Sequence, residues 1–293
     1  MALMNRKGVC YDVGRVMIGG NWRPKFDAEV VHKELEIIKD DLHCNAVRIC
    51  GLDVERLMIA GEDALSQGLE VWLSPEMWDM SQEETVEYVA RAAERAEGLR
   101  QEWPGKVLLS VGSELTLFSQ GIVEGKNVFD RISRPSLWAD IAAGRPNAPL
   151  NAYLSNLSQV AKKSFRGPLT YFSLPFEAVR WEQFDFVGVD HYRDSQNKSS
   201  YGQTASKYRS FGKPVIIGEF GCCTFRGADL LGANGFMISF GMMESILVPD
   251  QKLPKAFLDM AHIPPRVDGH YIRDEALQAS ELVDQLAVLD AAG

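Results

Sequence analysis

The sequence predicts an α/β fold, a TIM-type (β/α)8 barrel, from three observations. Short apolar β-type runs alternate with longer amphipathic segments almost to the C-terminus, as βα units around a parallel sheet do. The chain has 293 residues, which suffices for one large barrel domain. It contains neither a GxGxxG turn after a first strand nor a GxxxxGK(S/T) loop, so a doubly wound nucleotide-binding sheet is the second choice.

The first half of the chain alternates regularly. Asp27 is a plausible helix N-cap, Ser81 and Glu84 form a capping-box pattern, and Gly68 is a typical residue at a helix C-terminus. Strands are predicted over residues 8–14, 46–50, 69–75 and 107–114, and helices over residues 27–42, 53–67 and 81–103.

The second half is less regular. Residues 115–148 contain several glycines and a proline, so we expect an enlarged loop there, and loops of that size usually serve function. No internal repeat or linker divides the chain, so we expect one domain over residues 1–293, with an irregular insertion around 221–269 after the seventh strand. Further strands are predicted over residues 169–174, 184–192 and 214–220, and helices over residues 150–165, 200–211 and 273–292.

An eighth strand is not evident. The last helix should lead into it, but the sequence stops at Gly293. Residues 235–240 (GFMISF) are a β-type run, yet they follow the seventh strand too closely for a full helix in between. We therefore predict a barrel that is incomplete or irregularly closed at strand eight, as a truncated gene product would be.

Composition excludes several classes of function. Lys+Arg 31 against Asp+Glu 40 gives a net charge of −9, and no basic run is present, so neither nucleic acid nor a membrane surface is an expected partner. Residues 1–9 hold no signal-peptide segment and no window reaches roughly 18 apolar residues, which favours a cytoplasmic protein. The five cysteines form no CxxC pair, so we expect free thiols, no metal and no cofactor. Oligomeric state stays open.

Polar residues end the predicted strands, where the loops of a barrel line a single pocket. Glu114 and Glu219 end the two most apolar strands, and a buried carboxylate is costly unless it is compensated. An ion pair with Arg48 would explain either glutamate alone, whereas two facing carboxylates with separated pKa values favour catalysis. If strand alternation persists, Glu114 faces the barrel axis and Ser113 leans outward. The other strand-end residues are Tyr11, Asp12, Glu76, Trp78, Asp190, His191 and Tyr192.

These motifs resemble a clan of glycoside hydrolases with (β/α)8 barrels, which carry the acid/base glutamate after strand four and the nucleophile glutamate after strand seven. The matching residues are Glu114 in SVGSE and Glu219 in IIGEFG. NAVRI around Arg48 resembles the second-strand arginine that hydrogen-bonds the nucleophile, and VDHYR, with His191 and Tyr192, resembles the sixth strand, which contacts it. The resemblance implies a retaining glycosidase that cleaves a carbohydrate or glycoside by double displacement.

The sequence departs from the clan at two places. Ser113 stands where clan members usually have the asparagine that binds the sugar 2-hydroxyl. No tryptophan follows an eighth strand, so either Trp78 or Trp22 substitutes as the sugar platform or that part of the pocket is absent. Trp78 together with Tyr11 would be able to stack on a sugar face. Glu76 is the remaining residue that we expect to support the site.

Two other functions stay open. A barrel that binds carbohydrate without turnover would account for Ser113 and the unusual C-terminal part. A metal-dependent barrel hydrolase would use His191 with Asp190 and Glu219 as ligands, although further histidines near them are lacking.

Overall fold

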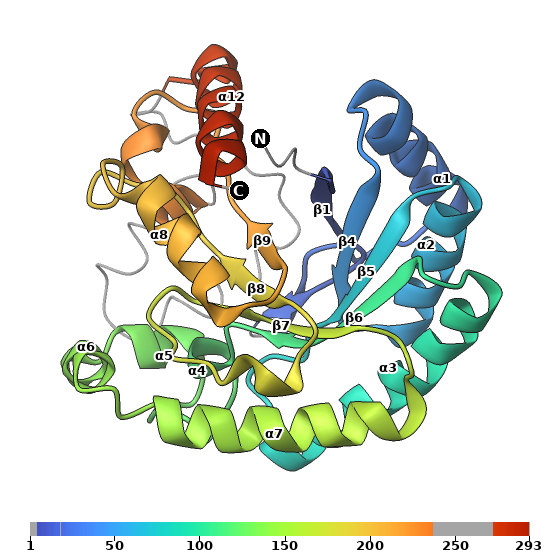
Figure 1. Cartoon of the computed structure of the whole chain (residues 1–293), viewed down its shortest axis with the longest axis horizontal. Helices are drawn as coiled ribbons and strands as arrows, with labels where there is room; N and C mark the ends of the chain where they lie inside the picture. The colour runs from blue at the N-terminus through green and yellow to red at the C-terminus, as the bar shows by residue number, and fades with distance from the viewer. Residues whose placement is uncertain (1–4, 18, 237–271, 293) are drawn as a thin grey trace.

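A computed structural model describes residues 5–17, 19–236 and 272–292. Seven parallel strands form one sheet in the order β1-β4-β5-β6-β7-β8-β9, and the sheet curves into a nearly closed barrel (Figure 1). Their order follows the sequence, as in a TIM-type barrel, so the predicted fold class is confirmed. The strands are β1 Gly8–Asp12, β4 Ala46–Gly51, β5 Glu70–Pro75, β6 Val107–Ser113, β7 Leu169–Ser173, β8 Val187–Asp190 and β9 Val215–Glu219.

Helices follow the strands and lie on the outer side of the sheet (Figure 1). Asp27 accepts hydrogen bonds from the first turn of α1, and Ser81 and Glu84 form both bonds of a capping box at α3, as predicted. The principal helices are α1 Ala28–Glu36, continued by the π-helical turn η1 Ile37–Asp41, then α2 Val54–Ser66, α3 Gln82–Glu102, α7 Asn147–Ser164, α8 Tyr201–Tyr208, continued by η3 Arg209–Phe211, and α12 Glu275–Ala292.

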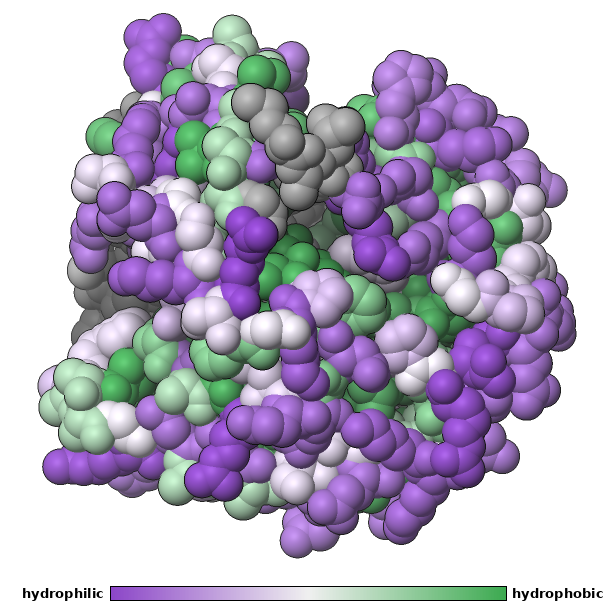
Figure 2. All heavy atoms as spheres, viewed as in Figure 1, coloured by the Kyte–Doolittle hydropathy of each residue, from purple (hydrophilic) through white to green (hydrophobic). Residues whose placement is uncertain are grey.

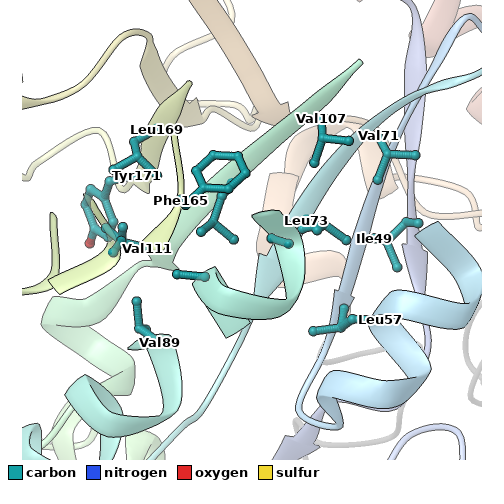
Figure 3. Close-up of a cluster of buried hydrophobic side chains, with 14 of the residues drawn as sticks. Ile49, Leu57, Val71, Leu73, Val89, Val107, Val111, Phe165, Leu169 and Tyr171 are labelled. Carbon is teal, nitrogen blue, oxygen red and sulfur yellow. The ribbon is translucent and has the colours of Figure 1, made fainter. Parts of the chain in front are cut away.

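The hydrophobic core has two layers because side chains alternate along each strand. The larger layer lies between strands and helices, and Figure 3 shows Ile49 and Val71 of the sheet with Leu57 of α2. On the face of Figure 2, hydrophilic residues cover most of the outer helices. The smaller layer fills the barrel interior with Ala46, Trp72, Leu108, Phe172 and Ile216.

The structure corrects the prediction at three places. The expected loop over residues 115–148 contains α4 Leu115–Phe118, α5 Val128–Ile132 and α6 Pro135–Ala142. The strand predicted over 184–192 is reduced to β8, because residues 184–186 and 191–192 lie outside it; the buried Phe184 ring packs against Trp181 of η2 Trp181–Gln183. A hairpin of β2 Val16–Met17 with β3 Gly20–Asn21 follows the first strand.

The barrel is irregular where an eighth strand was sought. β1 and β9 are the edges of the sheet in the described part of the chain, and the Cys10 thiol donates a 3.2 Å hydrogen bond from β1 to the Gly218 carbonyl of β9. The prediction of a barrel irregularly closed at strand eight is therefore confirmed for the described residues. Of the segment 221–269, residues 221–236 are described and carry η4 Ala228–Leu230 and η5 Gly232–Asn234; the rest, with most of the run 235–240, lies outside the described residues.

α12 packs against α8 and η4 beside this edge. Arg193, which follows β8, donates a hydrogen bond to Glu281 of α12 at 2.5 Å and one to Asp284 at 2.6 Å. Within the ranges given above, none of the helices combines the length and the hydropathy that crossing a bilayer requires. All five cysteines are free thiols.

Candidate active site

Arg48 lies at the centre of the site. Its side chain points into the barrel from β4, is 2% exposed, and lies over the Phe172 ring with Cζ 3.8 Å from the centroid. Nη1 donates to Asp190 Oδ1 at 3.0 Å and to Glu219 Oε1 at 3.4 Å, while Nη2 donates to Glu76 Oε1 at 3.2 Å. One guanidinium thus joins carboxylates from three strand ends, which fixes their mutual positions.

Glu114 directly follows β6 and has a left-handed backbone, with φ 52° and ψ 37°. Such a conformation costs a non-glycine residue about 1–3 kcal/mol and is concentrated at functional sites. The Glu114 amide donates to the Phe172 carbonyl of β7 at 2.9 Å, which holds the turn against the sheet. The turn re-aims the side chain from the strand end toward the carboxylates of β8 and β9.

Three carboxylates meet in this site. One oxygen from each of Glu114, Asp190 and Glu219 lies within 4.8 Å of the others. Burial raises the pKa of Glu114 well above its usual range, and the negative charges of Asp190 and then Glu219 raise it further. Burial also raises the pKa of Asp190 to about 7, against the opposing charge of Arg48. The environment therefore favours the protonated form of Glu114 over the ionised form more than water does.

Glu219 ends β9 and accepts hydrogen bonds on both carboxylate oxygens. Arg48 donates to Oε1, and the Tyr192 hydroxyl donates to Oε2 at 2.9 Å. Burial and the Glu219 charge raise the pKa of Tyr192, so this phenol remains a donor. The carboxylate side chain is 18% exposed, so it can meet a ligand from the barrel mouth.

Arg15 is a site residue that sequence reasoning missed. It lies in the loop after β1, where Asp12 fixes it by accepting from both its backbone amide at 2.9 Å and its Nε at 2.6 Å. Its Nη1 lies 3.5 Å from Glu76 Oε2 and 3.6 Å from Glu219 Oε1. The signal in the sequence that would have indicated it is a basic residue in the loop that follows the first strand, three positions after Asp12.

Aromatic residues border this arginine. Cζ of Arg15 lies 5.2 Å from the ring centroid of Trp22 and 5.7 Å from that of Trp78. The two indoles meet edge to face at 6.1 Å, and Phe118 stacks on Trp78 at 4.3 Å. Trp78 is half-buried, and its Nε1 is buried without a hydrogen-bond partner among the described residues. The structure therefore places the predicted platform residues together, next to Arg15.

Ser113 joins the site, contrary to the strand alternation we assumed. Its hydroxyl donates to Asp190 Oδ2 at 2.8 Å. The register of β6 against β7 shifts between Ser110 and Ser113, and Gly112 takes φ 153°, so the alternation is broken and both Ser113 and Glu114 turn inward. Glu76 also joins the site and accepts from the Ser74 hydroxyl at 3.1 Å.

Two predicted residues lie elsewhere. Tyr11 points away from the barrel axis, and its hydroxyl bonds Glu34 of α1 and Arg23. The His191 ring stacks on Tyr201 of α8 at 4.5 Å, outside the carboxylate group, and burial lowers its pKa. The structure does not bring either residue to the carboxylates, because strand alternation turns each of them outward from an inward-facing neighbour.

The carboxylates of Glu114, Asp190 and Glu219 are also the group whose spacing would suit a cation. His191 does not join them, so the ligand set expected for a metal-dependent hydrolase is not assembled. Two guanidinium groups already neutralise these oxygens in part, which favours an ion-paired carboxylate site.

Glu114→Gln is expected to stabilise the protein increasingly as pH rises above about 4.5. Because folding raises the pKa of Glu114, the unfolded chain loses this proton first, and the wild type loses up to about 1.4 kcal/mol per pH unit between the two pKa values. Glutamine has no proton to lose there. Urea unfolding from pH 4 to pH 8 measures the difference, with exposed Glu62→Gln as control; a constant difference across this range would contradict the expectation.

Comparison with known proteins identifies the fold. No family model matches this sequence, and no protein of curated function matches it. A GH113 β-1,4-mannanase structure matches with a TM-score of 0.54 at 14% identity, covering 96% of this chain and 99% of that chain. The GH113 β-mannanase AaManA from Alicyclobacillus acidocaldarius, in complex with ManMIm, matches with a TM-score of 0.54 at 13% identity, covering 100% and 99%. The chain therefore has the (β/α)8 fold seen in these glycoside hydrolases.

Proposed function

We propose that this protein is a retaining glycoside hydrolase with Glu114 as acid/base and Glu219 as nucleophile. The observation that carries the proposal is the approach of their carboxylate oxygens to within 4.8 Å. Retaining enzymes hold the two carboxyl groups about 5–5.5 Å apart, whereas inverting enzymes need about 6.5–9.5 Å to admit a water. The spacing supports direct attack by one carboxylate.

The two glutamates have the environments that these roles need. Glu219 would attack the anomeric carbon while Glu114 gives its proton to the departing glycosidic oxygen, which leaves a covalent glycosyl ester. A water would then give its proton to Glu114, attack the anomeric carbon and release Glu219. The raised pKa of Glu114 supports its role as acid, and Arg48 and Tyr192 orient the nucleophile.

The surrounding residues fit a carbohydrate. Trp22 and Trp78 lie beside Arg15, and Arg15 approaches Glu219, so aromatic and charged groups stand close together, a combination suited to the apolar face and hydroxyl edge of a sugar. The Ser113 hydroxyl already donates its hydrogen bond to Asp190. Recognition of the sugar 2-hydroxyl by Ser113 is therefore not part of the proposal. Sugar and linkage are left to experiment.

A panel of aryl glycosides with different sugars tests the proposal, followed by an activated 2-fluoro glycoside of the best sugar. We expect hydrolysis with retained anomeric configuration, by NMR, and one added glycosyl mass on the peptide that contains Glu219. The carbohydrate-binding alternative predicts saturable binding with neither turnover nor adduct. Label on another carboxylate, or inversion of configuration, would overturn the assignment.

A further inference from the structure

The four-residue helix α4 begins in an unusual way. Glu114 is its N-cap residue, a position whose side chain normally accepts a hydrogen bond from an amide in the first turn. The Glu114 side chain makes no such bond. Its carboxyl group lies instead with Asp190 and Glu219, so other groups must satisfy the first amides of the helix.

Those amides are satisfied by a buried pair from the next strand and its loop. The Leu115 amide donates to the Tyr171 hydroxyl at 2.8 Å, and that hydroxyl donates to Glu177 Oε2 at 2.8 Å. The Thr116 amide donates to Glu177 Oε1 at 3.1 Å. Tyr171 is fully buried and Glu177 is 9% exposed, so water does not readily replace either bond.

The pair itself rests on rigid elements. Tyr171 belongs to β7, and Glu177 also accepts the Leu174 amide at 2.9 Å, which fixes its own turn. The following residues are tied to α7, where Asn147 accepts the Ala178 amide at 3.0 Å. The first turn of α4 is thus positioned by elements that do not include the catalytic strand end.

We propose that Glu177, with Tyr171, is a positioning residue that replaces the N-cap of α4 and so leaves the Glu114 carboxyl free to act as acid/base. If Glu114 capped its own helix, its carboxylate would be turned to the Thr116 amide and away from Glu219. Glu177 makes that bond in its place, and the left-handed turn at Glu114 is held without using the Glu114 side chain. The acid/base role of Glu114 in this inference rests on the proposed function, whereas the replacement of the N-cap by Glu177 and Tyr171 does not depend on it.

Amide hydrogen exchange tests the structural part without any substrate. Tyr171→Phe should speed exchange at Leu115 by about tenfold or more, because it removes the acceptor of that amide. Glu177→Gln should speed exchange at Thr116, because its one remaining oxygen cannot replace both carboxylate oxygens, which accept from Thr116 and from Tyr171 and Leu174. Asp185→Asn is the matched control, since this carboxylate accepts the Leu169 amide at 2.8 Å at the opposite end of β7. Unchanged exchange at the two α4 amides in both variants would overturn the inference, whether or not the protein proves to be a glycosidase.

Leaving-group dependence tests the functional part. A poor leaving group needs the proton of Glu114, whereas an activated 2-fluoro glycoside needs only attack by Glu219. Both variants should lower kcat on the poor leaving group by about tenfold or more with KM little changed, and leave the labelling rate within about twofold. Equal losses in both assays would overturn the positioning role. Absence of any turnover in the wild type would instead reject the proposed function, and exchange would still decide the inference.

The pH profile separates the two variants. Burial raises the pKa of Glu114, and the charges that face it are Asp190, Glu219 and Glu177, which raise it, and Arg48, which lowers it. Glu177→Gln removes one of these negative charges, so the alkaline limb of kcat/KM should move to lower pH. Tyr171→Phe keeps the charge and should leave this limb in place; a shift of equal size in both variants would contradict the mechanism.

Discussion

Replacing Glu219 by glutamine is expected to lower kcat by about 10⁴-fold or more on every aryl glycoside that the wild type hydrolyses. The amide keeps the size of the side chain, but it is too weak a nucleophile to form the glycosyl ester. Folding should be retained, because glutamine still offers an oxygen to Arg48 or to the Tyr192 hydroxyl. Initial rates, with circular dichroism to confirm the fold, measure the effect.

Glu114→Gln is the matched comparison, because it makes the same chemical change in the partner carboxyl group. Loss of a general acid costs about 10²–10⁴-fold on a poor leaving group, and much less when the leaving group departs without a proton. Glu219→Gln should show no such dependence, since the glycosyl ester cannot form without Glu219 whatever the leaving group. A Glu219→Gln enzyme that retains more than a few per cent of wild-type activity would remove Glu219 from the mechanism.

Local signals predicted most of the barrel. The capping box of Ser81 and Glu84 forms as expected, and the strands around Arg48 and before Glu114 lie within one or two residues of their predicted bounds. The candidate site followed from topology, because parallel strands bring their C-terminal ends to one face of a barrel. Glu114 and Glu219 were therefore expected to approach each other although no local signal joins them.

Breaks in strand periodicity explain why Ser113 and Glu219 face the barrel interior. In β9, Ile216 packs into the inner cluster and Ile217 toward α8, so strict alternation would turn Glu219 outward. The register of β8 against β9 shifts between Val189 and Asp190, so that Gly218 is left without a partner and Glu219 pairs with Asp190. A Cβ on Gly218 would lie 2.2 Å from the Phe172 ring. A glycine therefore precedes Glu219 because the barrel interior leaves no space for a side chain there.

The groups that support the site were harder to predict than its glutamates. Arg15 and Glu177 lie in loops, and each is far in sequence from the residue it assists. Their roles come from burial and from hydrogen bonds to amides, neither of which alters the hydrophobic pattern that sequence reasoning uses. Arg15 offsets the negative charge of the clustered carboxylates. Glu177 accepts the hydrogen bond of the Thr116 amide, which the Glu114 side chain does not bind.

Arg48→Met is expected to destabilise the fold by about 3–5 kcal/mol at pH 7, the usual cost of removing one partner from a buried ion pair. Methionine fills a similar volume over Phe172 but leaves Asp190 without its cation and Glu76 with only the more distant Arg15. The side chains of these two carboxylates are 0% and 1% exposed, so water cannot replace the guanidinium. Urea unfolding at pH 7 measures the loss.

Arg48→Lys is the control, because it keeps the positive charge while giving up the fork geometry. One ammonium cannot reach Asp190, Glu219 and Glu76 together, so lysine should recover much of the stability but little of the orientation of the Glu219 carboxylate. Lowering the pH should shrink the penalty of Arg48→Met, since a protonated carboxyl needs no cation and the pKa of Asp190 is already raised to about 7. A methionine variant as stable as the wild type at pH 7 would contradict this expectation, and would mean that Arg48 does not stabilise the ionised form of Asp190.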